Sequence, residues 1–212
     1  MKRDGILVVI SGFAGAGKGT VVKGLMERHE GYALSVSMTT RAPRPGEKEG
    51  VSYFFTDKEH FEKTIAENGL VEYAQYCGNY YGTPRAYVEE KLSEGLDVIL
   101  EIEIQGAMKI KKLFPDSLLL FVMPPSAQIL KERLTGRGTE TPEVIKQRMD
   151  RAAGESEGIE DYDYILINDT VDRCVEEAHA VITASHARPK RNLALIEQMR
   201  ADLKKMAEEK DI

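Results

Sequence analysis

The sequence predicts an α/β fold in which helices flank an open, parallel β-sheet. Four short runs of aliphatic residues, at 6–10, 97–100, 117–123 and 164–167, are each bounded by polar or turn residues. A helical pattern follows each run, which is typical of buried parallel strands joined by crossover helices. A glycine-rich loop comes directly after the first run and opens a helix. Because open parallel sheets bind ligands at the carboxyl ends of their strands, this loop marks the expected ligand site.

The remaining elements complete this alternation. A fifth strand is expected at 32–38, where apolar and polar residues alternate less cleanly. Thr141 and Pro142 suit the N-cap and the first turn of one helix, since a hydroxyl can accept the free N–H groups there. The expected helices cover residues 18–29, 85–94, 105–113, 126–135, 142–157 and 170–184.

Three segments depart from the alternation. Residues 38–84 combine turn chemistry, aromatics and short strands, and are interpreted as an inserted subdomain. Residues 136–142 have little apolar content and predict a mobile loop. The tail at 190–212 carries apolar residues at a/d-like spacing, for which packing on the body is favoured over a dimer seam. These apolar residues are Leu193, Ile196, Met199, Leu203 and Met206.

Composition narrows the class of protein. A chain of 212 residues with 42% hydrophobic and 30% charged residues is typical of one globular α/β domain. The net charge of −6 argues against a nucleic-acid partner, although a nucleotide needs only a local cluster of cations. No apolar stretch approaches transmembrane length, so no membrane association is expected. Cys77 and Cys174 lie far apart without metal-ligand spacing, which favours a reduced, cytoplasmic protein.

The loop "ISGFAGAGKGT" (10–20) nearly matches the phosphate-binding pattern G-x-x-x-x-G-K-[ST]. Backbone N–H groups and the helix N-terminus would form a partly positive cup for phosphate oxygens, and Lys18 could reach the β- and γ-phosphates. Gly15 and Gly17 permit backbone angles that other residues resist. A tight turn without ligand needs neither this lysine nor so many glycines. The position that usually holds Mg²⁺ through Ser or Thr is Gly19, and a hydroxyl follows only at Thr20.

A second cluster of candidate residues lies between positions 37 and 85. Arg41 and Arg44, stiffened by neighbouring prolines, suit an oxyanion because the guanidinium fork grips phosphate with paired hydrogen bonds. A solvated basic loop is the alternative. Downstream, Glu72 and Thr83 lie among tyrosines, where a carboxylate and a hydroxyl could recognise the edge of a base. A surface strand would explain these last residues equally well.

Taken together, these motifs closely resemble guanylate kinase over roughly residues 5–185. The motifs that match are "GFAGAGKGT", "SMTTRAPRPGE", "EGVSYFF", "LVEYAQYCGNYYGT", "VILEIEIQGA", "RLTGRGTE" and "INDT". The resemblance implies the reaction ATP + GMP ⇌ ADP + GDP and a P-loop NTPase-type core with an inserted GMP-binding subdomain and a lid. It implies a core of residues 1–37, 85–132 and 151–189, a GMP-binding subdomain at 38–84, a lid at 133–150 and a helical tail at 190–212. A loop ending G-K-G-T resembles that of nucleoside monophosphate kinases, which implies Mg²⁺ held mainly by phosphates and water.

The resemblance also implies roles for individual residues. The catalytic cations would be Lys18, Arg41, Arg133, Arg137 and Arg148. ATP would contact the loop residues Gly12, Phe13, Ala14, Gly15, Ala16, Gly17, Lys18, Gly19 and Thr20, together with Arg137 and Asn168. GMP would contact Ser37, Arg41, Arg44, Tyr53 and Tyr81 through its phosphate, and Glu72 and Thr83 through guanine. Glu101 and Glu103 would lie near GMP and the metal's water molecules.

One position departs from the family pattern. Glu103 stands where the family more often has Asp, so its partners must shift or meet it through water. Residues two apart on a strand share a face, so Glu101 and Glu103 are expected to point into one cleft. The attacking GMP phosphate is already an anion, so no general base is required.

Two other functions compete with this interpretation. A guanylate-kinase-like module that binds proteins without catalysis usually lacks a working glycine loop, which this chain has. A kinase for a related phosphorylated acceptor is disfavoured by the guanine-reading residues. The expected partners are therefore ATP and GMP, with dGMP as a further substrate, and the chain is expected to be a monomer or a homodimer.

Overall fold

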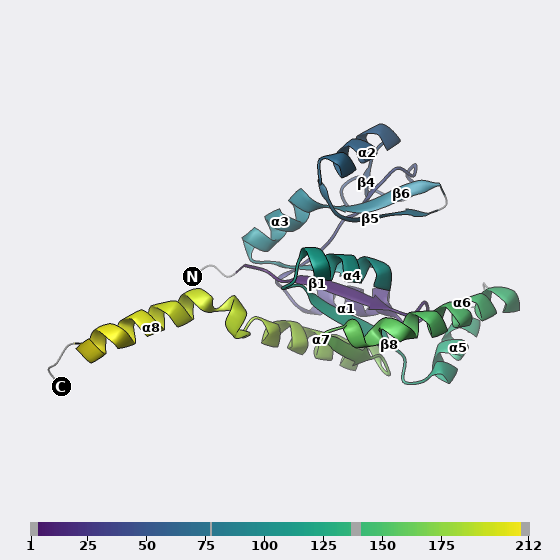
Figure 1. Ribbon diagram of the computed structural model, residues 1–212. Coiled ribbons are helices and arrows are strands. Elements are labelled where there is room, and N and C mark those ends of the chain that lie inside the picture. The colour runs from purple at the N-terminus through teal and green to yellow at the C-terminus, as the bar shows by residue number, and fades with distance from the viewer. Residues whose placement is uncertain (1–3, 77, 137–140, 209–212) are drawn as a thin grey trace.

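The computed structural model describes residues 4–76, 78–136 and 141–208 and contains two β-sheets, as Figure 1 shows. The larger sheet is five-stranded, with the order β2-β7-β1-β8-β9, and all its pairings are parallel. Its strands are β1 (Leu7–Gly12), β2 (Tyr32–Leu34), β7 (Asp97–Glu101), β8 (Leu118–Met123) and β9 (Tyr164–Ile167). The α/β fold class with a parallel core is thereby confirmed.

Helices cover both faces of this sheet because β1, β7 and β8 are too apolar to face water. All six residues of β1 are buried, and Leu118 to Val122 of β8 are buried as well. One face packs against α1 and α7, which also contact each other, and α3 and α4 contact β7 and β1 respectively. These helices are α1 (Lys18–Arg28), α3 (Arg85–Glu94), α4 (Ile104–Leu113) and α7 (Val171–Ser185).

Two more helices and a short 3₁₀ helix lie beyond the carboxyl ends of the strands. They are α5 (Ala127–Thr135), α6 (Pro142–Glu155) and η1 (Ser156–Asp161). The predicted cap is confirmed, since the Thr141 hydroxyl accepts the N–H of Val144 and Pro142 opens α6. Within the described part of the chain, no helix has the length and apolar content needed to cross a bilayer.

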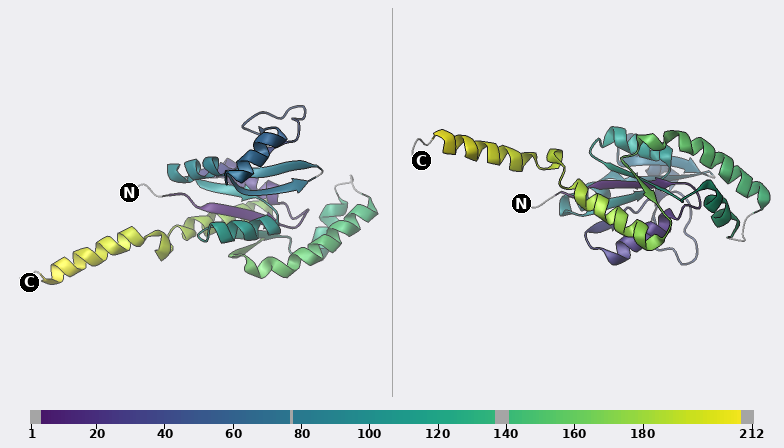
Figure 2. Two further views of the ribbon diagram at one scale, coloured as in Figure 1. Left: turned by 45° about the horizontal axis from the view of Figure 1, so that its top comes forward. Right: turned by 90° about the horizontal axis from the view of Figure 1, so that it is seen from below.

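A second, four-stranded sheet with the order β4-β3-β6-β5 stands over the core, as Figures 1 and 2 show. It falls within the residues 38–84 that the sequence sets apart. Its elements are β3 (Met38–Thr39), β4 (Phe54–Phe55), α2 (Lys58–Ala66), β5 (Leu70–Tyr76) and β6 (Asn79–Pro84). The long antiparallel β5–β6 pair forms its centre, and α4 of the core contacts β5.

The predicted strand at 32–38 is wrong in its extent. Only Tyr32–Leu34 joins the parallel sheet, beside β7. Met38 instead pairs with Phe54 and Gly82 in the second sheet. The chain therefore leaves one sheet and enters the other within this segment, which explains why its apolar alternation is irregular.

The expectation that the tail packs on the body is also wrong. A short turn, η2 (Pro189–Arg191), leads into α8 (Leu193–Glu208), which extends away from the rest of the molecule in all views (Figures 1 and 2). None of its residues is buried, and Leu193, Met199, Leu203 and Met206 are 56%, 54%, 58% and 63% exposed. The a/d spacing therefore describes a stripe that the body of this chain does not cover.

Deleting residues 193–212 should consequently leave the folded body almost unchanged. The deletion removes no buried side chain among the described residues of α8, so the melting temperature should change by less than about 2 °C. A deletion from His186 onward is the matched comparison, because it also removes the buried hydrogen bond between His186 Nε2 and Asp97 (2.9 Å). That longer deletion should lower the melting temperature by more than about 6 °C. The melting temperatures of both variants are measured by thermal unfolding. If the shorter deletion lowered the melting temperature as much as the longer one, α8 itself would stabilise the body.

Candidate active site

The glycine loop connects the end of β1 to the start of α1 at the carboxyl edge of the parallel sheet. Gly15 and Gly17 have φ angles of 89° and 90°, in the left-handed region that favours glycine. A Cβ atom at Gly17 would also lie 2.5 Å from Asn168 Nδ2. These glycines therefore let the backbone turn sharply over the neighbouring strand ends, and the conformational freedom expected from the sequence is used.

Lys18 begins α1 with its ammonium folded back over the loop. Its Nζ donates to the carbonyl of Gly12 at 2.5 Å. The charge thus lies beside the end of β1, within the loop that the sequence assigns to phosphate. The adjoining loop residue Phe13 has a different environment, because its ring is buried edge-on against Phe121 in the core.

Gly19 faces a carboxylate. An ideal Cβ built at this position would lie 3.6 Å from both carboxylate oxygens of Glu101, the last residue of β7. Burial raises the pKa of Glu101; the positive charge of Lys18 acts to lower it, while the negative charge of Glu103 adds to the rise. The position that lacks a metal-binding hydroxyl is therefore next to an acidic side chain.

Asn168 and Arg133 support the loop from below. Asn168 is 2% exposed and its amide donates to the carbonyl of Ala16 at 2.8 Å. Arg133, near the end of α5, donates to the carbonyls of Asn168 (2.7 Å) and Ala16 (3.4 Å). In this conformation Asn168 holds the loop and is not exposed to a base. Arg137 lies outside the described residues.

A cleft of about 780 Å³ separates the second sheet from the core. Three parts of the chain converge on it: the second sheet, the end of β7 with the start of α4, and the end of α6 with η1. The predicted GMP-binding residues that line the cleft are Ser37, Glu72, Tyr81, Glu101 and Glu103, and Lys109 lines it as well.

One corner of the second sheet gathers the predicted phosphate-binding residues. The guanidinium of Arg41 lies 5.3 Å from the centre of the Tyr53 ring, and Tyr53 meets Tyr81 edge-on at 6.0 Å. Arg41 Nη2 donates to Glu47 Oε1 at 2.7 Å, and the backbone N–H of Arg44 donates to Glu47 Oε2 at 2.7 Å. The Arg41 hydrogen bond is the main cause that lowers the pKa of Glu47. A carboxylate thus sits where the sequence predicts a bound anion.

Glu72 and Thr83 are brought together as cross-strand partners of β5 and β6. The Thr83 hydroxyl donates to Glu72 Oε1 at 2.8 Å. Burial raises the pKa of Glu72, which the Thr83 hydrogen bond and the positive charge of Lys109 counteract. A half-buried carboxylate with one lone pair occupied is well suited to accept further N–H donors.

The prediction that Glu103 lies on the same strand as Glu101 is wrong. Strand β7 ends at Glu101, and Glu103 is the N-cap residue of α4. Both carboxylates nevertheless line the cleft. Glu103 accepts from Arg151 of α6 at 3.1 Å, with both side chains about 60% exposed. Arg148 lies half-buried on α6 and is not among the cleft-lining residues described.

Comparison with known proteins agrees with this geometry. The family model described as "Guanylate kinase" matches residues 4–185. The chain belongs to the guanylate kinase family. A guanylate kinase of Halalkalibacterium halodurans is 48% identical over 198 residues, which cover 93% of this chain and 97% of that protein. One from Streptococcus pneumoniae is 49% identical over 187 residues, covering 88% and 90%. The crystal structure of guanylate kinase from Anaplasma phagocytophilum has a TM-score of 0.74 at 31% identity, covering 95% and 96%.

Sequence reasoning missed two residues of the site, Glu47 and Arg151. Glu47 holds Arg41, and the signal that could have revealed it is an acid three residues after Arg44 in the same turn. Arg151 reaches Glu103 from 48 residues away, and no local pattern predicts such a contact. The family model ends at Ser185, where α7 ends, so α8 lies outside it.

Replacing Lys18 with Met should keep the fold and reduce turnover strongly. The ammonium contacts only the loop carbonyl among the described residues, so its loss costs little stability, while one missing donor to a reacting phosphate costs about 10²–10³ in rate. Lys23→Met on the exposed side of the same helix is the control and should keep normal turnover. Steady-state kinetics with ATP and GMP measure both variants. Retention of more than about a third of normal turnover by the Lys18 variant would contradict the assignment of the loop.

Proposed function

We propose that this protein is an ATP:GMP phosphotransferase, a transferase that moves the γ-phosphate of ATP to GMP. One observation carries the proposal beyond family membership: Glu72 and Thr83 are paired on β5 and β6, in the same sheet as the cluster of Arg41, Tyr53 and Tyr81. A group that reads a base and a group that holds a phosphate are therefore joined in one sheet. Glu101, which lies beside Gly19 of the glycine loop, lines the same cleft as Glu72 and Tyr81.

In the proposed reaction the protein supplies position and charge. Lys18 and the loop N–H groups would hold the β- and γ-phosphates, and Arg41 and Arg44 would hold the GMP phosphate. Bringing two anions together is the main barrier that these cations reduce. For this, Arg41 must exchange Glu47 for phosphate, and Lys18 must leave the Gly12 carbonyl. Arg133 would contribute by holding the loop, with Arg137 and Arg148 as further cations.

Guanylate kinases generally require Mg²⁺, and Glu101 is the residue that fits it here. Its carboxylate lies beside Gly19 and acts electrostatically on Lys18, so it lies next to the expected phosphates. Within the described ranges, no three His, Cys, Asp or Glu side chains group closely enough to hold a metal alone. As the resemblance of the loop to that of nucleoside monophosphate kinases implies, the metal would be held mainly by phosphates and water, with Glu101 accepting from that water. When bound, Mg²⁺ neutralises charge on the transferred group.

The two competing functions have less support. An inactive protein-binding module has no use for a loop built as tightly as this one, with Lys18 and the supporting Asn168. A different phosphorylated acceptor would not require the Glu72–Thr83 pair. Tolerance of dGMP, a cytoplasmic location and a monomeric or dimeric state remain predictions.

Burial raises the pKa of the free Cys174 thiol to about 11, so this cysteine has no expected chemical role.

The direct test is an ADP-release assay with ATP and GMP, dGMP, AMP, CMP or UMP as acceptor. Rapid release with GMP and negligible release with the other ribonucleotides is expected. Faster release with any other ribonucleotide would overturn the proposed acceptor, and no release with any acceptor would favour the inactive module.

Base selectivity should depend on Glu72. Guanine offers two adjacent donors, N1–H and the 2-amino group, to a carboxylate, and its O6 can accept the Thr83 hydroxyl once that hydroxyl turns away from Glu72 Oε1. Adenine lacks both donors, so the site should reject AMP by about 10⁴ or more in kcat/KM because buried polar groups would stay unpaired. Glu72→Gln should weaken the binding of GMP and reduce the GMP:AMP ratio of kcat/KM, since an amide presents one acceptor and one donor.

The control is Glu67→Gln, at the exposed C-terminal end of α2 in the same part of the chain, which should leave the GMP:AMP ratio unchanged. kcat/KM for GMP and AMP is measured for the wild type and both variants. An unchanged ratio in the Glu72 variant would mean that guanine is read by other residues.

A further inference from the structure

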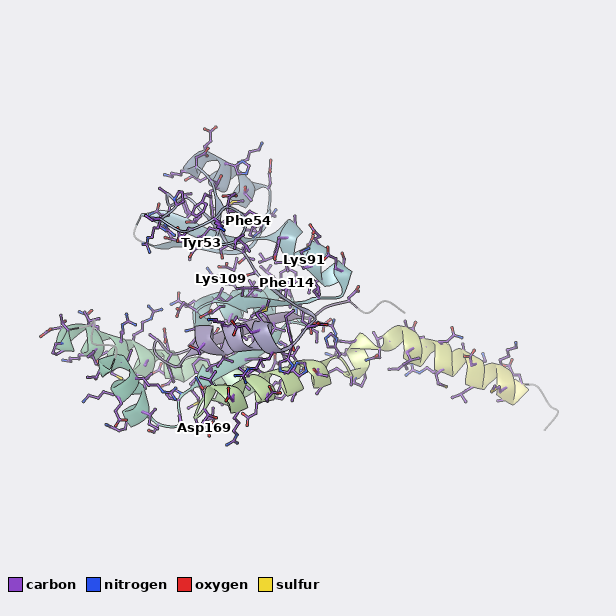
Figure 3. All side chains as sticks on the ribbon, turned by 180° about the vertical axis from the view of Figure 1, so that it is seen from behind. Tyr53, Phe54, Lys91, Lys109, Phe114 and Asp169 are labelled. Carbon is purple, nitrogen blue, oxygen red and sulfur yellow. The ribbon has the colours of Figure 1, made fainter. Side chains whose placement is uncertain are left out.

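A second cavity of about 510 Å³, here called the outer cavity, adjoins the cleft at Glu72. Its walls come from the end of α2, from β5, from the start of α3 and from the C-terminal half of α4. The cationic residues that line it are Arg85, Lys109 and Lys112. Glu72, Tyr73 and Lys109 line both this cavity and the cleft. Lys109 therefore lies at the partition between the two spaces, and Figure 3 labels it where the core faces the second sheet.

Lys109 is the cation best placed to act on Glu72. It projects from α4, the core helix that contacts β5. Among the described residues no hydrogen bond or ion pair holds its ammonium, whereas the guanidinium of Arg85 donates to the carbonyl of Asn68 and lies near Glu89. Burial raises the pKa of Glu72, and Lys109 is the one charged group in the described part of the chain that acts to lower it.

We propose that Lys109, which lines both cavities together with Glu72, is a positioning residue for guanine recognition that presents its positive charge to the Glu72 carboxylate from the core side. This inference rests on the proposed function. A protonated Glu72 would offer a hydroxyl where guanine presents N–H groups, and one of the two contacts would be lost. Lys109 belongs to the core and Glu72 to the second sheet. The attraction between their charges therefore acts across the cleft in which the base would bind.

Other ionisable groups share the two cavities with Glu72, from each element packed around it. They are Tyr73 and Tyr81 of the second sheet, Arg85 of α3, Lys112 of α4, Glu101 and Glu103 at the end of β7, and Arg151, Glu155 and Glu157 at the end of α6 and in η1. Arg151 is engaged with Glu103 and Glu155. Lys112 lines the outer cavity and not the cleft, so it is the matched control for Lys109.

The experiment compares Lys109→Gln, Lys109→Arg and Lys112→Gln with the wild type. kcat and kcat/KM for GMP are measured from about pH 5.5 to about pH 8.5, where a raised carboxyl pKa would become visible. Removing the cation raises the pKa of Glu72, so in Lys109→Gln the acidic fall of kcat/KM should move to higher pH. The loss at pH 6 should exceed the loss at pH 8 by about threefold or more, with kcat at saturating GMP little changed. Lys109→Arg and Lys112→Gln should follow the wild-type profile.

Because the phosphate of GMP itself titrates near pH 6, the kinetic profiles are compared as ratios of variant to wild type.

A direct titration of Glu72 complements the kinetic measurement. Carbon-13 NMR of the Glu72 side-chain carboxyl in the nucleotide-free protein should show a higher titration midpoint in Lys109→Gln. In a Glu72→Gln background the Lys109→Gln change should leave the pH profile unaltered, because no carboxyl group remains to respond.

The outcomes separate this inference from the proposed function. If Glu72→Gln narrows base selectivity while Lys109→Gln moves neither the kinetic profile nor the carbon-13 midpoint, Lys109 has no such role and the proposed function stands. If Lys109→Gln moves the midpoint but Glu72→Gln leaves selectivity unchanged, guanine is read elsewhere and both fail. An equal loss in Lys109→Gln and Lys112→Gln would indicate only a general effect of surface charge and would overturn the inference.

Discussion

The burial of β1 in the middle of the parallel sheet is the constraint on which the site depends. β1 is paired on both edges, with β7 and β8, and all six of its residues are buried, so its carboxyl end cannot shift independently. The glycine loop starts from that fixed end. The neighbouring β7 ends beside it at Glu101, and Asn168, just after β9, supports the loop from below. One packing requirement therefore fixes the loop, its acid and its support together.

Several cations of the site are already engaged by acceptors from the same chain. Lys18 donates to the Gly12 carbonyl, Arg41 to Glu47, and Arg133 to the carbonyls of Asn168 and Ala16. In each case the acceptor offsets a positive charge that would otherwise repel its neighbours or attract any anion. The acceptor for Arg41 is itself a carboxylate, so a substrate phosphate must compete with an acid of the protein. Such competition favours the more highly charged phosphate over a simple carboxylate ligand.

How far the sequence predicted this arrangement depended on the range of the interactions. The four aliphatic runs, the glycine loop and the Thr141 cap are local patterns, and each appears where expected. The resemblance implied that Glu72 and Thr83 share a role, but their direct pairing across β5 and β6 came only from the structure. The contacts of Glu103 with Arg151 and of Asn168 with Ala16 join distant segments and were not predictable. Neither was the position of Lys109 in the same cavities as Glu72. The tail was misjudged because an a/d pattern shows which face is apolar but not what covers it.

The half-buried acid Glu72 connects the fold to the specificity. Removing a carboxylate from water is costly unless its oxygens accept hydrogen bonds or a cation lies nearby. In the described structure one oxygen accepts from Thr83, and burial still holds the pKa of Glu72 above its ordinary value. This cost falls when a ligand supplies two N–H donors, even if the Thr83 hydroxyl turns to the ligand, and it remains when a ligand supplies none. A guanine base thus lowers a free energy that the empty site already carries, whereas an adenine base would add an unpaired acceptor beside it.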